Sequence, residues 1–240
     1  MNMNEKAKTI FRILKSTYKI DLNDFAVMHV FKKNVDVFKV LVITILTQNS
    51  TDKAAYRAYQ KLADMINITP SDIVNLDIRK LKDAIREAGL YNTKANALKK
   101  LSKIVLEKYN GSLDFLLNID LNEARKILTS LPKVGPKTAD VVLLMLGKRS
   151  TIPIDTHINR VSKRLGLVSQ KSGYEEIRLM LMKLYDPSEY LDVHLLLIQH
   201  GRKTCKAIRP RCSECPINIL CDYYDRAKQT SNPSLLTKMF

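Results

Sequence analysis

Lys137 is the residue of this chain best placed to act as a nucleophile. It lies in LPKVGPKTAD, residues 131–140, just after a Gly/Pro turn and just inside an apolar stretch. A lysine amine attacks carbon only when it is neutral, and its reference pKa of about 10.4 keeps it protonated at pH 7. A helix N-terminus disfavours a cation and therefore favours the neutral amine. The residues alone leave open a second interpretation, in which Lys137 binds a phosphate group.

Asp155 is the second candidate for chemistry, 18 residues further along in STIPIDTHINRVSKRLGL, residues 150–167. Pro153 interrupts the preceding segment and Gly166 is a typical helix end, so Asp155 is predicted to be the N-cap of the helix between them. The same carboxylate could take a proton from the lysine or stabilise positive charge that develops on a sugar. Local sequence leaves both roles open.

The four cysteines of the chain fall within one short segment, CKAIRPRCSECPINILC, with the spacing C-x6-C-x2-C-x5-C. In a chain without an export signal this spacing favours one metal site, and a disulfide pair is the weaker alternative. Thiolates select soft metals, which leaves zinc or an iron–sulfur cluster, and the spacing alone does not choose between them. The candidate ligands are Cys205, Cys212, Cys215 and Cys221.

Two predicted helices, joined by a short turn, position Lys137. Residues 121–129 form one predicted helix, and the next has an apolar stripe at Ala139, Val142, Leu143 and Leu146. Between them, SLPKVGPK can point unpaired backbone N–H groups outward, beside the positive end of the second helix dipole. Such a turn can bind a phosphate without recognising sequence. An ordinary helix–helix connection is the alternative.

The rest of the chain predicts an all-α protein. Helix signals include Thr69 before Pro70, Asp77 before an apolar stripe that ends near Gly89, and a helical pattern over residues 93–109. The run FKVLVITIL, residues 38–46, is rich in β-branched residues and would also suit a buried strand, but its neighbours favour a helix. Residues 223–240 are polar and are predicted to be a loosely held tail.

The composition favours a polyanionic partner. The 240 residues include 40 Lys and Arg against 24 Asp and Glu, a formal charge of +16. Nucleic acid is the expected partner, and a basic surface without a ligand is the alternative. An acidic membrane is less favoured, because no apolar run approaches the roughly 20 residues that span a bilayer. The N-terminal segment lacks the features of a signal peptide, so we expect a cytoplasmic protein associated with DNA.

Several motifs, in order and spacing together, resemble the endonuclease III family, the iron–sulfur branch of the helix-hairpin-helix DNA glycosylases. The resemblance runs from about Phe38 to Cys221, three quarters of the chain. It includes ILTQNSTDKA, GLYNTKA, LPKVGPKTADVVL, IDTHINRV, HGRKTC and the cysteine spacing. It implies a [4Fe-4S] cluster on the four cysteines, and catalytic roles for Lys137 and Asp155.

The family implies a bifunctional DNA glycosylase and abasic-site lyase of base excision repair. Lys137 would attack C1′ of a nucleotide that is rotated out of the duplex, and β-elimination would then cut the strand. Asp155 would assist departure of the base. We expect oxidised pyrimidines of the thymine glycol type as substrates. The alternatives are a sister glycosylase for a purine or mismatch lesion, and a DNA-binding protein without catalysis.

The same resemblance implies two helical domains with an interdomain cleft and a C-terminal cluster loop. Residues 30–149 would form a six-helix barrel with the hairpin, and residues 1–29 would join 150–222 in the cluster domain. The expected partner is double-stranded DNA that contains damaged bases or abasic sites, and we expect a monomer without membrane association. The predicted DNA contacts are Gln48, Asn49, Lys94, Lys133, Val134, Gly135, His157, Lys206, Arg209 and Arg211.

Two positions depart from the family pattern. Lys133 replaces the first glycine of the usual Leu-Pro-Gly-Val-Gly hairpin, so a positive φ there would cost on the order of 1 kcal/mol. Its charge could recover a contact with phosphate. The family glutamine that fills the space of the extruded base falls nearest Asn49, with Gln48 one residue earlier. Either amide could bond to the orphaned partner base.

Overall fold

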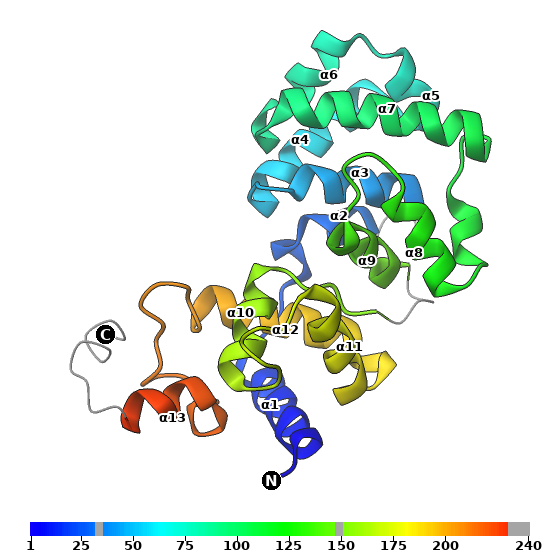
Figure 1. Ribbon diagram of the computed structural model, residues 1–240. Helices are drawn as coiled ribbons and strands as arrows, with labels where there is room; N and C mark the ends of the chain where they lie inside the picture. Colours follow the sequence, from blue (N-terminus) through cyan, green and yellow to red (C-terminus); the bar gives the residue numbers. More distant parts are fainter. Residues whose placement is uncertain (32–35, 147–150, 230–240) are drawn as a thin grey trace. The chain divides into compact units, whose positions relative to one another are not determined.

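The computed structural model describes residues 1–31, 36–146 and 151–229, and these residues form helices and turns without a strand (Figure 1). The all-α prediction is confirmed. Among the described helices, none is both long enough and apolar enough to cross a membrane.

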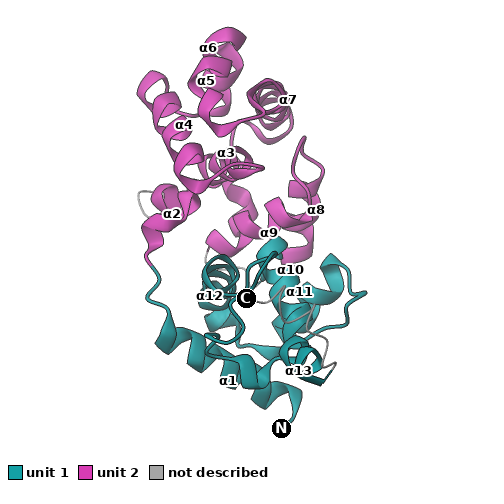
Figure 2. Ribbon diagram, turned by 90° about the vertical axis from the view of Figure 1, so that its left-hand side faces the viewer, with its two compact units in different colours: residues 1–20, 150–240 teal, residues 21–149 magenta. Residues whose placement is uncertain are grey.

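The chain divides into two compact units, which Figure 2 shows in different colours. One unit comprises residues 1–20 and 150–240, and the other comprises residues 21–149. The helices of the first unit are α1 (Met3–Thr17), α10 (Thr156–Leu165), α11 (Tyr174–Leu184), α12 (Tyr190–Lys203) and α13 (Asp222–Gln229). Those of the second unit are α2 (Ala26–Phe31), α3 (Val37–Thr47), α4 (Asp52–Met65), α5 (Pro70–Asn75), α6 (Ile78–Ala84), α7 (Tyr91–Tyr109), α8 (Leu121–Thr129) and α9 (Pro136–Met145).

Each unit is built around one helix that is buried on nearly all sides. In the second unit this is α3, which packs against α2, α4, α7 and α9. Its continuous apolar run is therefore a fully buried helix, which explains why periodicity did not separate helix from strand. In the first unit α12 has the same place, with α1 and α10 packed on it.

The predicted helix boundaries are largely confirmed where a cap defines them. Thr69 and Asp77 are N-caps whose side chains accept backbone N–H bonds, and α8 spans residues 121–129 as predicted. The helix after Asp77 ends earlier than expected, because a 3-10 turn at Arg86–Ala88 precedes Gly89. Helix α7 begins at Tyr91 rather than near residue 93.

The predicted loose tail is wrong for its first part. Residues up to Gln229 belong to α13, which buries Ala227, and Asp222 at its start accepts a 2.6 Å bond from Lys6 of α1. A polar helix of this kind is held by a few specific contacts rather than by an apolar stripe, so periodicity does not reveal it. Residues 230–240 lie outside the described part of the chain.

Candidate functional site

The turn between α8 and α9 has the geometry of an open anion-binding site. Gly135 is the N-cap of α9 in an extended conformation, and no side chain caps the helix. A Cβ on Gly135 would meet no heavy atom within 4 Å, so the approach to the first turn is open. The leading N–H groups of a helix without a side-chain cap are available to an external acceptor.

Lys133 occupies the left-handed position of this turn, with φ of 63°. The side chain is exposed, whereas that of the neighbouring Val134 is buried and anchors the turn. The positive φ was the condition under which lysine in place of glycine was predicted to be costly. The turn therefore carries a strain of about 1 kcal/mol at the residue that presents a positive charge.

Lys137 is the second residue of α9, and its side chain is exposed. Its ammonium group has no hydrogen bond or ion pair with any described residue. From Thr138 to Met145 the same helix is buried, so only its first turn faces solvent. The fold thus anchors the backbone of Lys137 in a largely buried helix while its side chain stays exposed to solvent.

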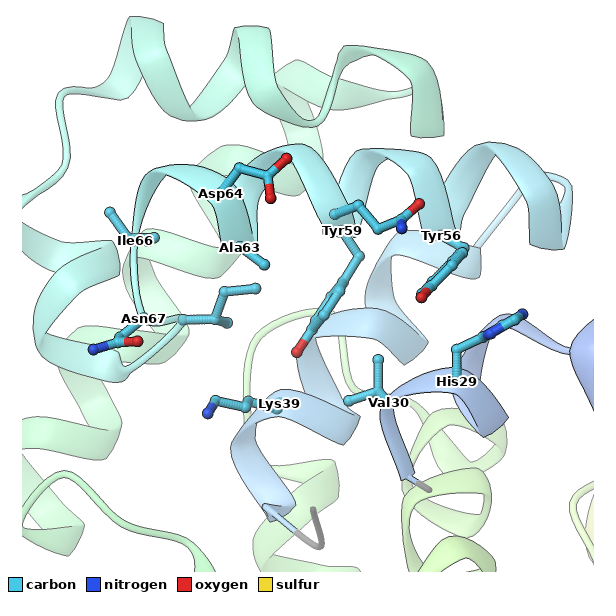
Figure 3. A pocket seen from close by; sticks show the side chains of 11 residues that line it. His29, Val30, Lys39, Tyr56, Tyr59, Ala63, Asp64, Ile66 and Asn67 are labelled. Carbon is cyan, nitrogen blue, oxygen red and sulfur yellow. The ribbon is translucent and has the colours of Figure 1, made fainter. Parts of the chain in front are cut away.

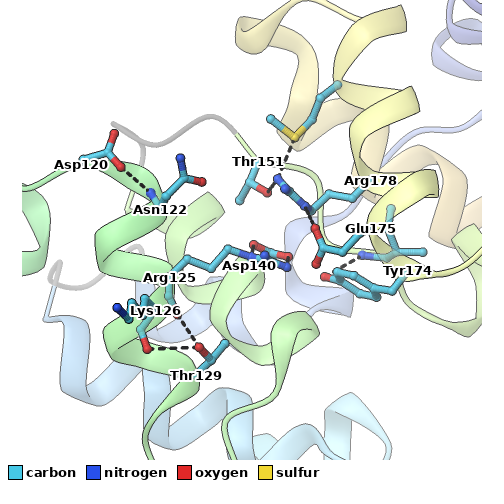
Figure 4. A network of polar contacts seen from close by, with 12 residues as sticks. Asp120, Asn122, Arg125, Lys126, Thr129, Asp140, Thr151, Tyr174, Glu175 and Arg178 are labelled. Atoms are coloured by element: carbon cyan, nitrogen blue, oxygen red, sulfur yellow. Dashed lines mark hydrogen bonds and ion pairs between the residues drawn. The ribbon is translucent and has the colours of Figure 1, made fainter.

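A buried ion pair holds the two helices of the hairpin together. Asp140 of α9 is fully buried and accepts bonds of 2.8 and 3.2 Å from Arg125 of α8 (Figure 4). A two-point contact of this kind fixes orientation as well as distance. It sets the angle at which α9 presents Lys137.

The loop after α3 is bonded to the hairpin. The side-chain amide of Gln48 donates to the Lys133 carbonyl at 2.9 Å and to the Thr138 hydroxyl at 3.1 Å. The next residue, Asn49, is exposed and left-handed, with φ of 49°. The two candidates for the space of the extruded base therefore differ: Gln48 is engaged within the protein, and Asn49 faces solvent.

Leu90 is an exposed apolar residue that the sequence analysis did not single out. Its side chain is 56% exposed, and its φ of 48° is unusual for leucine. A Cβ on the preceding Gly89 would lie 3.9 Å from the Asn49 carbonyl oxygen, so the turns at Asn49 and Leu90 are neighbours. The sequence signal for this residue was a leucine placed between Gly89 and the start of a helix. It was not used, because an apolar residue at such a position is expected to be buried.

The predicted DNA contact at Lys94 does not fit the structure. Lys94 is 3% exposed, and its ammonium donates bonds of 2.8 Å to the carbonyl oxygens of Leu46 and Ala88. Burial lowers the pKa of Lys94 to about 8. Because the Lys94 ammonium is buried and bonded to two main-chain carbonyl groups, it cannot reach a DNA phosphate from this position.

Asp155 belongs to the other unit, where it is the N-cap of α10 as predicted. Its carboxylate accepts a 2.7 Å bond from the backbone N–H of Ile158, and the residue is half-buried. Two residues later, His157 contacts Arg160 at 3.2 Å, and burial lowers the pKa of His157. The structural role of Asp155 is therefore present, and one carboxylate oxygen remains for chemistry.

Arg160 connects α10 to the cysteine segment and was also missed. Its guanidinium donates to the carbonyl oxygens of Gly201 and Cys205, each at 3.0 Å. A Cβ on Gly201 would lie 2.8 Å from that of His157, so only glycine allows this close packing. The motif IDTHINRV contained this arginine, but its local pattern did not distinguish it from a surface cation.

All four cysteines line one small pocket in the first unit, together with His200, Tyr223 and Tyr224. Cys221 is buried and the other three are partly exposed. Burial raises the pKa of Cys212 to about 11 and that of Cys215 to about 12, so thiolates here need nearby positive charge. No group of three or more His, Cys, Asp or Glu side chains in the described residues is arranged to hold a metal ion. A cluster, in which each cysteine binds a different iron, instead needs four thiols around a shared space.

The loop between the first two cysteines is basic and exposed. Lys206, Arg209 and Arg211 all face solvent, and Arg209 is left-handed with φ of 50°. Arg164 of α10 holds the base of the loop through the Lys206 carbonyl at 2.7 Å and Cys205 Sγ at 3.4 Å. The three cations are therefore displayed on a braced loop.

A separate pocket of about 340 Å³ lies in the second unit, between α2, the start of α3 and α4 (Figure 3). Its walls include the stacked rings of His29 and Tyr56 and the side chain of Tyr59. None of the predicted site residues lines this pocket, so the chemistry proposed from sequence does not take place there.

Comparisons with known proteins agree with the hairpin and the helical fold. Residues 42–187 match the model of the HhH-GPD superfamily of base excision DNA repair proteins. The chain is 40% identical over 219 residues to endonuclease III of Sulfolobus acidocaldarius, which covers 91% of this chain and 96% of that protein. It is 37% identical to endonuclease III of Escherichia coli strain K12, over 79% of this chain and 85% of that protein.

Two solved structures are similar over most of the chain. One is a trapped endonuclease III–DNA covalent intermediate in an estranged-adenine complex, with a TM-score of 0.70, 33% identity and coverage of 80% of this chain and 86% of that one. The other is a non-covalent endonuclease III–DNA complex, with a TM-score of 0.77, 28% identity and coverage of 95% and 100%.

Proposed function

Because this chain belongs to the endonuclease III family, within the HhH-GPD superfamily of base excision DNA repair proteins, we propose that it removes oxidised pyrimidines of the thymine glycol type. It is a DNA-binding, bifunctional DNA glycosylase and abasic-site lyase of base excision repair. The observation that carries the residue assignment is Lys137, an exposed amine on the first turn of a rigid helix.

Lys137 is the proposed nucleophile. The nitrogen of its neutral amine bonds to C1′ of the damaged nucleotide while the bond from C1′ to the base breaks, and the base departs with that electron pair and takes up a proton. Loss of a proton from nitrogen and opening of the sugar give an imine. Removal of a C2′ proton then expels the 3′ phosphate by β-elimination and cuts the strand. This attack requires the neutral form of the amine.

Asp155 is the second residue that we propose takes part in this reaction. One of its carboxylate oxygens caps α10, which holds the group in a single orientation. The remaining acceptor capacity can stabilise positive charge at C1′ or take a proton as the base departs. We assign it to base excision rather than to DNA binding, because a carboxylate repels phosphate.

The proposed DNA contacts are the hairpin and two exposed turns in the second unit, and the basic cysteine loop in the first unit. Lys133, Gly135 and the open N–H groups of α9 bind backbone phosphate, and Lys206, Arg209 and Arg211 add contacts that do not depend on sequence. Asn49 takes the place of the extruded base, since Gln48 is bonded to the hairpin. Leu90 acts as an apolar wedge between base steps, a use of leucine known from proteins that bend DNA. His157, two residues after Asp155, is a further proposed DNA contact of the first unit.

The cysteine pocket is proposed to hold a [4Fe-4S] cluster. The fit rests on four thiols that line one shared space, and on the raised pKa values of the partly buried Cys212 and Cys215, which need nearby positive charge to become thiolates. Cys205, Cys212, Cys215 and Cys221 would hold it, and its chemistry in this account is structural. The protein's own contribution is to keep the basic loop in place.

We further propose that the chain has two functional domains, residues 30–149 and residues 1–29 with 150–222, although residues 21–29 belong to the second compact unit. We also propose that the enzyme is a cytoplasmic monomer on damaged duplex DNA. The proposal of two functional domains is supported by the position of Lys137 in one unit and of Asp155 and the cysteines in the other.

Borohydride trapping tests the proposal. Purified protein is incubated with duplexes that carry thymine glycol, 8-oxoguanine, uracil opposite guanine or an abasic site, and the imine is reduced to a stable adduct. Adducts with thymine glycol and the abasic site are expected. Trapping on the abasic site and on the duplex with a purine lesion would show that the enzyme is a sister glycosylase specific for purine damage. An absence of trapping on every duplex would contradict the lysine mechanism.

A further inference from the structure

Lys94 is a buried cation with two partners inside the second unit. Its side chain is 3% exposed, and its ammonium donates bonds of 2.8 Å to the carbonyl oxygens of Leu46 and Ala88. Lysine is rarely buried to this degree, because removal of its charge from water is unfavourable unless specific bonds replace hydration. The position therefore calls for an explanation beyond packing.

Both carbonyl groups lie at the ends of helical segments. Leu46 is the penultimate residue of α3, and Ala88 is the last residue of the 3-10 turn before Gly89. Terminal carbonyl groups of a helix lack partners within the helix, and they carry the negative end of its dipole. A single ammonium thus bonds to terminal carbonyl groups of two segments that are distant in sequence.

Each of these chain ends leads directly into an exposed turn. Asn49 is three residues beyond Leu46, and Leu90 is two residues beyond Ala88. Both turn residues are left-handed, with φ of 49° and 48°. The Asn49 carbonyl oxygen lies 3.9 Å from the point where a Cβ on Gly89 would stand, so the turns are side by side.

We propose that Lys94 is a positioning residue that joins the bases of the Asn49 and Leu90 turns and fixes the spacing at which both enter DNA. This inference rests on the proposed function, in which Asn49 fills the space of the extruded base and Leu90 separates adjacent base steps. Two residues that enter one duplex must keep their separation, because a shift of either would displace the other from the stack. A buried clamp between their supporting carbonyl groups supplies that constraint.

Lys99 provides a matched control on the same helix. Its ammonium also donates to two carbonyl groups, those of Val74 at 2.7 Å and of Leu76, at the end of α5. Neither carbonyl belongs to the turns at Asn49 and Leu90. Removal of Lys99 therefore tests the general effect of losing such a clamp from α7 without disturbing the proposed DNA contacts.

The experiment compares wild type, Lys94→Met and Lys99→Met. Duplexes carry thymine glycol or an abasic site, and a 2-aminopurine opposite or beside the lesion reports the loss of base stacking through its fluorescence. Lys94→Met is expected to reduce the fluorescence increase by at least half and single-turnover excision of thymine glycol about tenfold, with less than a threefold effect on cleavage of a preformed abasic site. Lys99→Met is expected to stay within twofold of wild type in every measurement.

A double-variant cycle separates positioning from stability. If Lys94 acts through the turns, Lys94→Met added to Leu90→Ala should reduce excision by less than threefold beyond Leu90→Ala alone. Independent, multiplicative losses would overturn the proposal, as would a Lys94→Met protein with wild-type fluorescence and excision. Lys94→Gln, which keeps one donor group, should give an intermediate response and replaces Lys94→Met if the latter does not fold. Absence of excision by wild type would instead contradict the proposed function.

Discussion

The side-chain amide of Gln48 donates a 2.9 Å hydrogen bond to the main-chain carbonyl of Lys133, and thereby ties the loop after α3 to the hairpin. A second bond from the same amide reaches the Thr138 hydroxyl, one residue beyond Lys137. The segment that is proposed to replace the extruded base and the segment that carries the nucleophile are therefore one connected structure. The correct spacing between them is set before DNA binds.

Replacement of Lys137 by glutamine is expected to abolish borohydride-trapped adducts while affinity for abasic DNA stays within about threefold of wild type. The variant keeps a polar side chain of similar length but has no nucleophilic amine. Lys133→Gln is the matched control on the same turn, and it should retain trapping. Undiminished trapping by Lys137→Gln would show that another amine is the nucleophile.

Lys133→Gly is expected to change stability and DNA binding in opposite directions. Glycine removes the strain of the left-handed residue, so the free energy of unfolding should rise by about 1 kcal/mol. Loss of one phosphate contact should at the same time weaken DNA binding and reduce the slope of log K against log[salt] by about 0.9. Thermal unfolding and a salt titration measure the two effects. Lower stability of the glycine variant would mean that the lysine side chain stabilises the turn.

Asp155→Asn separates capping from catalysis. Asparagine is as good an N-cap as aspartate, so stability should change by less than about 0.5 kcal/mol, whereas Asp155→Ala should lose about 1 kcal/mol. Excision of thymine glycol should fall about a hundredfold in both variants, because neither retains the carboxylate. Normal turnover by Asp155→Asn would return Asp155 to a purely structural role.

Cys212→Ser is expected to lose iron and the visible absorption of a cluster, and to weaken DNA binding through disorder of the loop that carries Arg209 and Arg211. Ser213→Ala, at the exposed neighbouring position, is the control and should retain both properties. Iron and zinc are measured in the purified proteins. Stoichiometric zinc without iron in wild type would contradict the cluster assignment.

The sequence was sufficient to predict those parts of the structure that a local cap or turn determines. Asp155 as an N-cap follows from the residues around it, and the positive φ at Lys133 was raised as a condition by the glycine that the family pattern has there. The hairpin helices follow from apolar spacing for the same reason. The residues proposed for chemistry were therefore accessible from sequence, although their roles still depend on the experiments above.

The residues whose environments were not predicted from the sequence are those whose neighbours come from distant segments of the chain. Lys94 was taken for a surface cation, although it is in phase with Leu98, Leu101 and Val105 on the buried face of α7. That register was the available signal, but only the carbonyl groups of two distant segments explain how a charge is accommodated there. Leu90 and Arg160 were not singled out, because the residues that surround them are remote in sequence and local patterns do not reveal them.

The burial of Lys94 makes a last prediction, about the pH dependence of stability. Its pKa is lowered from 10.5 to about 8 in the folded protein by burial. Between pH 8 and 10.5 the unfolded chain therefore binds more protons than the folded one, and stability rises with pH through this window. Relative to Lys94→Met, wild type should gain about 2 kcal/mol between pH 7 and pH 9.5. Thermal unfolding of both proteins at the two pH values measures this difference, in which contributions from other groups cancel. Parallel pH dependence would mean that Lys94 keeps its proton throughout, because the two carbonyl bonds offset the effect of burial.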